Sequence, residues 1–235
     1  MRVAHRGGAA LAPENRLAAF RTGLENDADA LELDIHLSKD GRLVVMHDAS
    51  VDRTTDGRGF VADLTVPELK ALDAGARFRG PGVGRQEIPL LEEVLELIDG
   101  SGNDRVQLQV EIKLRQDGSR YAGIEEELVS VLRDWSFIDR TTVLSFDFAS
   151  LDVIHAIEPG LRTCALVGKD YFRMAAGRTP GQIAHELATL GTDSVGIREQ
   201  NLTRRLFEAL RLEGLAVGAW TVDAPGRMHE LAADR

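Results

Sequence analysis

The stretch that decides the fold is LELDIHLSKDGRLVVMHD, residues 31–48. In its first half, aliphatic residues alternate with Glu32, Asp34 and His36. Side chains two positions apart on a β-strand share one face, so one face of this strand is aliphatic and the other carries acid. The second half returns after a turn at Asp40-Gly41, which is a typical hairpin signal. We predict a hairpin whose first strand has an aliphatic face and an acidic one.

A second strand repeats this pattern in VQLQVEIKL, residues 106–114, where Glu111 and Lys113 share the face opposite the aliphatic residues. Two strands of this kind fit a barrel in which the aliphatic faces meet outer helices and the polar faces point inward. Glu32, Asp34, Glu111 and Lys113 would then converge near the carboxyl ends of the strands.

Strand and helix patterns alternate along the whole chain. We expect strands at 2–5, 31–37, 106–112, 141–146, 161–167, 193–197 and 215–222. We expect helices at 15–26, 90–99, 124–134, 148–157, 180–190, 203–213 and 226–233. This alternation predicts an α/β protein with a parallel sheet, and the polar strand faces favour a (β/α)8 TIM barrel over an open sheet. Seven barrel strands are recognisable, and the eighth strand is not evident.

One segment interrupts the regular alternation of strands and helices. Residues 1–235 are expected to form a single TIM-barrel domain, but the connection between the second strand and the helix at 90 is far longer than the usual βα loop of about 2–6 residues. We interpret its glycine- and arginine-rich part, about 49–88, as a small insertion subdomain after strand 2. Long βα loops lie on the catalytic face of barrels, so this insertion is expected to form a lid or rim that reads the substrate head group.

Composition limits the partners. The formal net charge of −10 argues against nucleic acid, which rewards basic faces, whereas a small phosphate needs only a local positive pocket. We expect no membrane span, because no apolar run approaches the ~20 residues that a bilayer requires. The start of the chain does not resemble a signal peptide, and the single cysteine, Cys164, suits a reducing compartment, so a cytoplasmic location is expected. The oligomeric state is left open.

Three inward carboxylates would repel one another unless a cation or protons compensated them. A hard divalent cation with oxygen ligands, Mg²⁺ or Ca²⁺ with Mn²⁺ as a third candidate, is the economical solution. The alternative interpretation is that these residues form salt bridges on an exposed sheet face.

Histidine and other basic side chains are further candidates for this site. His5 and His47 follow strands, and a pair of histidines can act as acid and base near neutrality. Arg6 can bind a phosphate through two parallel hydrogen bonds, whereas Lys113 can bind it only as a point charge. The remaining histidines are interpreted as ordinary polar side chains: His36, His155, His185 and His229.

At this point the motifs match a family. HRGG, PEN, ELD, KDG, HD, RTTDG, IPLLEEVL, EIK and WTVD occur in this order over most of the chain. In this set and spacing the sequence resembles the glycerophosphodiester phosphodiesterases. The family pattern usually reads PENT, whereas here Arg16 replaces the threonine, a change at the entry to the first helix that should be tolerable.

The resemblance implies roles for particular residues. Glu32, Asp34 and Glu111 would be ligands of one divalent metal ion, and His5 and His47 the acid–base pair. Arg6 and Lys113 would contact the phosphate. Trp220 would form a wall for the glycerol or its leaving group, unless it is a core tryptophan. Glu14 and Asn15 would lie near the site or brace the first helix, and Asp48 would orient a neighbouring group.

The implied reaction is metal-dependent hydrolysis of glycerophosphodiesters, such as glycerophosphocholine or glycerophosphoethanolamine, to sn-glycerol 3-phosphate and an alcohol. One alternative is a phospholipase D-like lipase of the sphingomyelinase D type, although those proteins are usually secreted and disulfide-bonded. The other is a non-catalytic phosphoester-binding barrel, which would be expected to lack a ligand or a histidine.

The family usually continues into an eighth strand. A C-terminal segment could be missing, or a loop or another subunit could fill the gap; we favour the first, because residues 1–235 otherwise contain every site residue.

Overall fold

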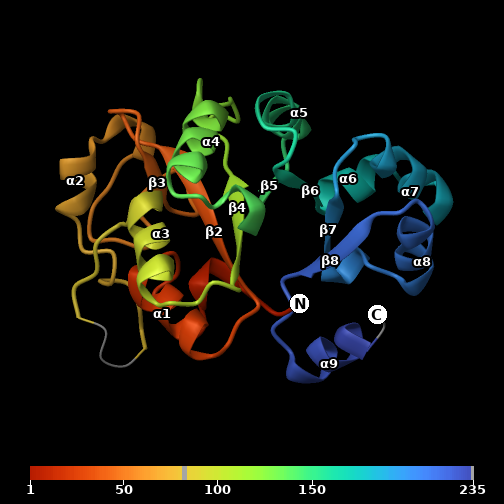
Figure 1. Ribbon diagram of the computed structural model, residues 1–235, viewed down its shortest axis with the longest axis horizontal. Helices are drawn as coiled ribbons and strands as arrows, with labels where there is room; N and C mark the ends of the chain where they lie inside the picture. Colours follow the sequence, from red (N-terminus) through yellow and green to blue (C-terminus); the bar gives the residue numbers. More distant parts are fainter. Residues whose placement is uncertain (81–83, 234–235) are drawn as a thin grey trace.

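The computed structural model describes residues 1–80 and 84–233. Its strands are β1 Val3–Ala4, β2 Ala30–Leu37, β3 Leu43–Val45, β4 Gln107–Ile112, β5 Thr141–Ser145, β6 Arg162–Val167, β7 Ser194–Arg198 and β8 Ala216–Trp220 (Figure 1). Its helices are α1 Leu17–Glu25, α2 Val66–Lys70, α3 Leu91–Gly100, α4 Ile124–Asp134, α5 Phe148–Ile157, α6 Lys169–Met174, α7 Pro180–Ala188, α8 Arg204–Leu212 and α9 Pro225–Ala233.

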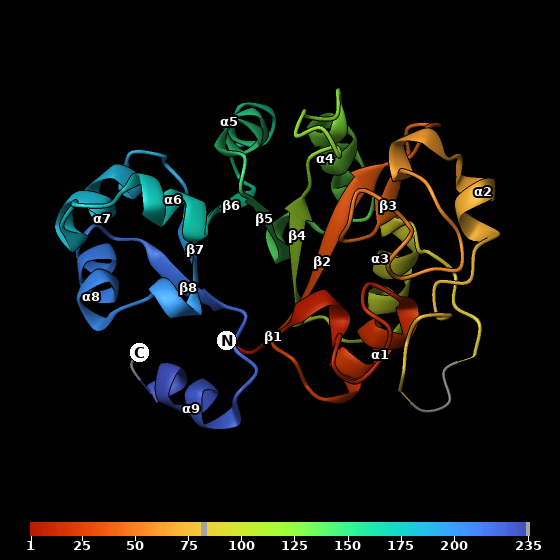
Figure 2. The ribbon, with the colours of Figure 1, turned by 180° about the vertical axis from the view of Figure 1, so that it is seen from behind.

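The strands form one curled sheet in the order β1-β2-β4-β5-β6-β7-β8, and every neighbouring pair along this path is parallel. Helices lie around the outside of the curl (Figures 1 and 2). Within residues 1–80 and 84–233 no ladder joins β8 to β1, so these two strands are the sheet edges. The predicted α/β architecture with a parallel, curled sheet is confirmed, and the described residues contain seven parallel strands.

The aliphatic face of β2 packs outward, as predicted. Leu31, Leu33 and Ile35 are fully buried in the main hydrophobic cluster with Phe20 of α1 and Leu95 of α3. Burying such a side chain stabilises the fold by about 1.5–3 kcal/mol. Because the outward positions of β2 are fixed by this core, Glu32 and Asp34 must face the inside of the barrel.

The predicted hairpin at Asp40-Gly41 is also present. β3 runs antiparallel to β2 with Leu37 opposite Leu43, and Gly41 has a φ of +76° in the turn. This positive φ explains the glycine, because other residues pay a steric cost there. β3 runs back along β2, with Val45 opposite Ile35 and the N–H of Met46 donating to the Asp34 carbonyl, so His47 follows at the level of the acidic residues of β2.

The long connection after the hairpin has an apolar cluster of its own. Its members are Val44, Met46, Val51, Val61, Leu69, Ala74 and Ile88. The segment contains α2, a helix of 5 residues that the sequence pattern did not separate from its surroundings. The pattern also missed α6, which has 6 residues. Both are shorter than two helical turns, too short for a 3.6-residue period to be recognised.

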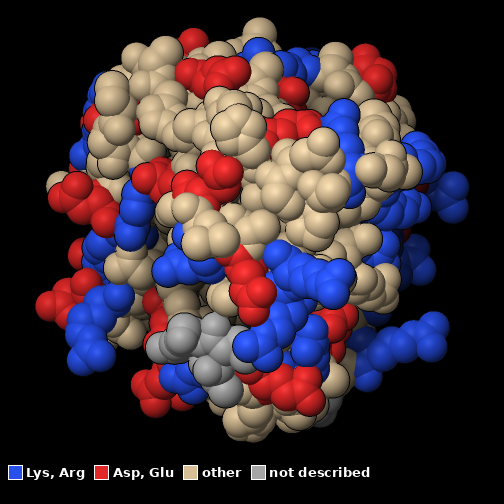
Figure 3. Space-filling view, turned by 90° about the vertical axis from the view of Figure 1, so that its right-hand side faces the viewer, with Lys and Arg blue, Asp and Glu red and all other residues tan. Residues whose placement is uncertain are grey.

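One face of the molecule shows a surface of mixed charge. Acidic and basic side chains are interspersed over the face seen in Figure 3. In the part of the chain that the structure describes, no helix combines the length and apolarity needed to cross a bilayer.

Candidate active site

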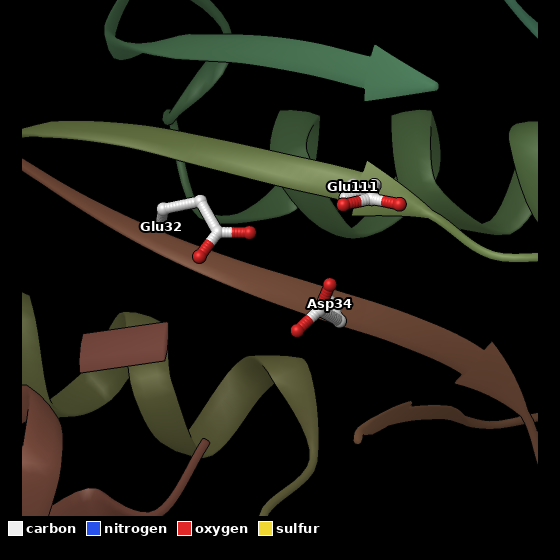
Figure 4. A group of neighbouring side chains, drawn as sticks. All are labelled: Glu32, Asp34 and Glu111. Atoms are coloured by element: carbon white, nitrogen blue, oxygen red, sulfur yellow. The ribbon is translucent and has the colours of Figure 1, made fainter. Parts of the chain in front are cut away.

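Three acidic side chains converge inside the barrel. Asp34 of β2 and Glu111 of β4 are paired in register, and Glu32 lies two residues before Asp34 on the same face. Each of the three can offer an oxygen such that all three oxygens lie within 4.8 Å of one another. Figure 4 shows their carboxylates turned toward one another from two neighbouring strands. All three side chains are buried, so their charges act on one another with little screening by water.

The electrostatics of this cluster favour a bound cation. Burial and the two neighbouring carboxylates raise the pKa of Glu32 well above its ordinary value. Burial raises the pKa of Glu111 to about 7, with Asp34 adding to the shift and Lys113 opposing it. These shifts measure the cost of holding several carboxylates together, a cost that a hard cation with oxygen ligands removes. The donor set therefore fits Mg²⁺, Ca²⁺ or Mn²⁺, and the residues do not select among them.

Lys113 already balances part of this charge. Its ammonium lies 2.8 Å from Asp34 Oδ1 and forms a second ion pair with Glu111. Burial alone would raise the pKa of Asp34, but Lys113 and then His47 outweigh it, so this pKa is lowered. Asp34 is thus the carboxylate that stays ionised.

The HRGG segment brings His5 and Arg6 to the cluster. The backbone N–H of Arg6 donates to Glu32 Oε2 at 2.7 Å, which requires Arg6 to adopt a left-handed φ of +50°. Gly7 follows at φ +79° and lies so close to α1 that a Cβ would be 2.8 Å from the backbone N of Phe20. Burial, followed by the Arg6 charge, lowers the pKa of His5, so His5 is neutral at neutral pH and can accept a proton.

Asn15 of the PEN motif supports the same carboxylates. Its Nδ2 donates to Asp34 Oδ2 at 2.7 Å, and both residues are buried. Arg6 approaches from the same side, with its Nε 3.7 Å from that oxygen. Of the two roles considered for Asn15, the structure therefore favours the one at the site.

His47 is oriented by two neighbours. Its Nδ1 donates to the carboxylate of Asp48 at 2.6 Å, which leaves Nε2 as the nitrogen that can exchange a proton. Burial and then Lys113 lower the pKa of His47. Its backbone carbonyl accepts a bond of 3.2 Å from Nε2 of His36, whose Nδ1 lies 2.9 Å from the Tyr121 hydroxyl.

His36, interpreted from the sequence as an ordinary polar side chain, has a structural role. Its exposed fraction is 1%, and burial lowers its pKa to about 4. His36 is thus a neutral, buried hydrogen-bonding residue that fixes the segment carrying His47.

An ion-pair network links the two histidine-bearing segments. Glu14 accepts from Arg6 at 2.9 Å and from Arg53 at 2.6 Å. Arg53 also donates to Asp48 at 2.6 Å. Burial alone would raise the pKa of Asp48, but the bonds from Arg53 and His47 lower it to about 2. Asp48 is therefore ionised and holds His47, as the sequence suggested it would hold a neighbour.

Arg16, the departure from PENT, is completely buried. Its Nη1 donates to the backbone carbonyls of Asn15 at 2.8 Å and Val45 at 3.1 Å. Burial lowers its pKa to about 10, so it remains a cation at neutral pH. The arginine thus ties the PEN segment to the hairpin strand that precedes His47.

Trp220 lies apart from the carboxylates. It ends β8, and β5, β6 and β7 stand between it and Glu111 in the sheet. Its Nε1 donates to the Gly196 carbonyl at 3.0 Å, and its ring packs on an apolar cluster inside the barrel. The ring also borders a cavity. Both roles considered for Trp220, a wall for the substrate and a core tryptophan, therefore have a structural basis.

Sequence reasoning missed Arg53, Tyr121 and Asp223. Arg53 begins the RTTDG motif and Asp223 ends WTVD, so their motifs carried a signal although no role was assigned. Asp223 is close enough to His5 for its charge to raise the pKa of that imidazole against the larger effect of burial. Tyr121 lies in a connection with no recognisable pattern, and only the fold brings it to His36.

Barrel enzymes carry their active sites at the carboxyl ends of the parallel strands. A group of charged side chains on the inner face of this curled sheet therefore fits a barrel enzyme. The chain belongs to the glycerophosphoryl diester phosphodiesterase family, whose model matches residues 5–233. It is accordingly a phosphodiesterase of the hydrolase class.

Individual members of the family match this chain over nearly its whole length. A glycerophosphodiester phosphodiesterase of Caldanaerobacter subterraneus subsp. tengcongensis is 35% identical, over 97% of this chain and 88% of that protein. The crystal structure of glycerophosphodiester phosphodiesterase from Agrobacterium tumefaciens superposes with a TM-score of 0.78 at 27% identity, covering 100% of this chain and 93% of that one. An Oleispira antarctica phosphodiesterase in complex with the product sn-glycerol-3-phosphate has a TM-score of 0.81 at 26% identity, covering 99% and 89%.

Proposed function

We propose that this protein hydrolyses glycerophosphodiesters, such as glycerophosphocholine or glycerophosphoethanolamine, to sn-glycerol 3-phosphate and an alcohol. The observation that carries the proposal is the approach of three buried carboxylates to within 4.8 Å beside two histidines of lowered pKa. The relative crystallised with sn-glycerol-3-phosphate supports the same product.

Glu32, Asp34 and Glu111 would hold one divalent cation. When bound, this cation would neutralise phosphate charge and act as a Lewis acid on a nonbridging oxygen. Arg6 and Lys113 would bind the remaining phosphate charge, and Lys113 is positioned for this because its ammonium already lies at the carboxylates.

His5 and His47 would move the protons. One neutral imidazole takes the proton of the attacking hydroxyl, and the other, protonated, donates to the departing alcohol oxygen as the P–O bond breaks. The Asp48 carboxylate on Nδ1 of His47 stabilises the imidazolium form. The attacking group is either water, or the glycerol 2-hydroxyl followed by water opening the cyclic phosphate.

The test is release of glycerol 3-phosphate from glycerophosphocholine, with Mg²⁺, Ca²⁺, Mn²⁺ or EDTA. We expect release with at least one metal and none with EDTA. Glu32→Gln removes one charge with little change in shape and should lower kcat/KM by at least 100-fold. The matched control is Glu126→Gln on α4, an exposed position where the same chemical change should alter kcat/KM less than twofold.

Binding of the metal itself gives a second readout. Isothermal titration of Mg²⁺, Ca²⁺ and Mn²⁺ should show one site in the parent protein and in the control, and loss of that site in Glu32→Gln. Metal-dependent turnover that survives in Glu32→Gln would show that the carboxylate cluster is not the catalytic metal site. A folded protein that binds metal but hydrolyses no diester would instead be a phosphoester-binding barrel.

A further inference from the structure

At the level of the carboxylates, the inward face of the sheet is acidic on β2 and β4 and apolar on β5 and β6. Residues paired in register point to the same face of the sheet, so the row that begins with Asp34 and Glu111 continues as Leu144 on β5 and Cys164 on β6. Leu144 and Cys164 are buried together with Leu166. At this level the acidic lining therefore ends at β4, and an apolar lining begins at β5.

Two inward positions on the far side of the barrel are occupied by glycine, and only one of them is open. The inward positions of β7 and β8 include Gly196 and Gly218, which face each other in register. A Cβ at Gly196 would lie 2.5 Å from Leu166 Cδ2, whereas a Cβ at Gly218 would meet only the Val195 carbonyl, at 4.0 Å. Barrel interiors are normally filled by layers of side chains. Leu166 fills the space at Gly196, whereas Gly218 leaves space inside the barrel at β8.

A cavity of about 700 Å³ lies above β5 to β8. Its apolar lining consists of Phe146, Phe148, Leu166, Tyr171, Met174 and Trp220. We call these six residues and their cavity the apolar cleft. Phe146 and Trp220 meet edge to face with ring centroids 5.4 Å apart. Although they line a concavity, Phe146 is 47% exposed and Met174 is 72% exposed, which is unfavourable unless something apolar covers them.

The charges at the edge of the cleft do not favour an ammonium head group. Asp170 is paired with Arg173 at 3.2 Å, and Glu199 with Arg227 at 2.9 Å. The other two charged lining residues, Lys169 and Arg198, are positive, and neither enters an ion pair with the residues that the structure describes. The charges at this rim that have no ion-pair partner among the described residues are therefore positive, and they would repel a cationic head group.

We propose that the apolar cleft binds an alkyl or acyl chain carried by the phosphodiester, whose phosphate lies at the carboxylates. This inference rests on the proposed function and adds the substrate class, monoacyl or alkyl glycerophosphodiesters. It differs from the expectation that the 49–88 insertion reads the head group, because the cleft lies over β5 to β8.

The test varies chain length in two series, each from 2 to 10 carbons and below the micellar concentration. One series carries the chain on the glycerol as a 1-acyl group, and the other carries it on the alcohol that leaves. Full burial of a methylene is worth up to about fourfold, so kcat/KM should rise about two- to fourfold per carbon and level off when the cleft is full. A slope in either series supports the proposal and identifies the chain's source, and no slope in either overturns it.

Substitution localises the effect. Met174→Asp puts a charge on the cleft wall and should reduce the dependence on chain length to less than 1.5-fold per carbon. Leu212→Asp, at a position that is 89% exposed on α8, makes the same kind of change elsewhere and should leave the slope intact. Equal slopes in the two variants would show that the chain does not bind in the cleft.

A binding readout separates this proposal from catalysis. The chain has two tryptophans, so a Trp135→Phe variant reports on Trp220 alone. Titration with n-alkyl phosphates of 2 to 10 carbons should change the Trp220 fluorescence, with affinity rising two- to fourfold per carbon. If no diester is hydrolysed but this titration succeeds, the proposed function fails and the chain-binding site stands. If glycerophosphocholine is hydrolysed but kcat/KM depends on chain length in neither series, the proposed function stands and the chain-binding site fails.

Discussion

Gly7 offers the most direct test of how the HRGG segment is built. It has a φ of +79°, and an added Cβ would lie 2.8 Å from both the backbone N and Cδ1 of Phe20. Gly41, in the hairpin turn, has nearly the same φ of +76° but has nothing within 4 Å of an added Cβ. Gly7→Ala and Gly41→Ala therefore share the backbone cost, and only the first adds a steric clash.

The magnitudes follow from these contacts. A left-handed conformation costs a non-glycine residue about 1–2 kcal/mol, and the reduced freedom of the unfolded chain offsets about 0.4–1 kcal/mol. Gly41→Ala should therefore lower the free energy of unfolding by about 1 kcal/mol. Gly7→Ala adds an overpacking cost of about 1–3 kcal/mol, because the nearest atoms belong to a helix backbone that cannot rotate away. The expected total is about 2–4 kcal/mol.

Urea unfolding of the parent protein and both variants measures this difference, with a shift in midpoint at constant slope as the signature of a pure stability change. Turnover should separate the variants further. His5 and Arg6 directly precede Gly7, and a displacement of about 1 Å costs roughly 100-fold in rate, so kcat/KM should fall at least tenfold in Gly7→Ala only. Equal stability losses in the two variants would refute the close approach as the reason for the glycine.

Three further predictions concern the site. Asn15→Leu leaves Asp34 Oδ2 without its buried donor, which should cost about 1–3 kcal/mol in urea unfolding; an unchanged midpoint would contradict this. The pKa of Asp48 is lowered from 3.8 to about 2, so its stabilisation is complete above pH 3.8 and is lost as the pH falls through 2. The parent should thus lose stability faster than Asp48→Asn between pH 4 and pH 2, and parallel curves would rule this out. Mg²⁺ or Ca²⁺ at 100 times its dissociation constant should raise the free energy of unfolding by about 2.7 kcal/mol, measured by thermal melts, and a similar rise in Glu32→Gln would be inconsistent with the cluster as the binding site.

Much of the fold could be predicted from sequence because its patterns are long and unambiguous. The β2 alternation spans 8 residues and α4 spans 11, and in both the apolar period identifies the buried face. The convergence of Glu32, Asp34 and Glu111 followed from two facts, a shared strand face and the parallel pairing of adjacent strands. Neither fact requires knowledge of side-chain packing.

The supporting residues could not be predicted in this way. Arg53 joins Glu14 across 39 positions and His36 joins Tyr121 across 85, and such distant contacts leave no local pattern. Arg16 was treated as a tolerable replacement of threonine because position alone does not reveal burial. Its hydrogen bonds to two carbonyls emerge only when the PEN segment and β3 are folded against each other.

The position of Lys113 has a consequence for how this protein matures. Many small metal-binding domains are unfolded without their ion, because uncompensated ligands cannot be buried. Here an internal ammonium lies between Asp34 and Glu111, so part of the charge is balanced as soon as β2 and β4 pair. Synthesis of the folded protein should therefore not depend on metal supply. Under the proposed metal dependence, a metal-starved cell would accumulate a reserve of intact, inactive protein that becomes active on loading, without refolding.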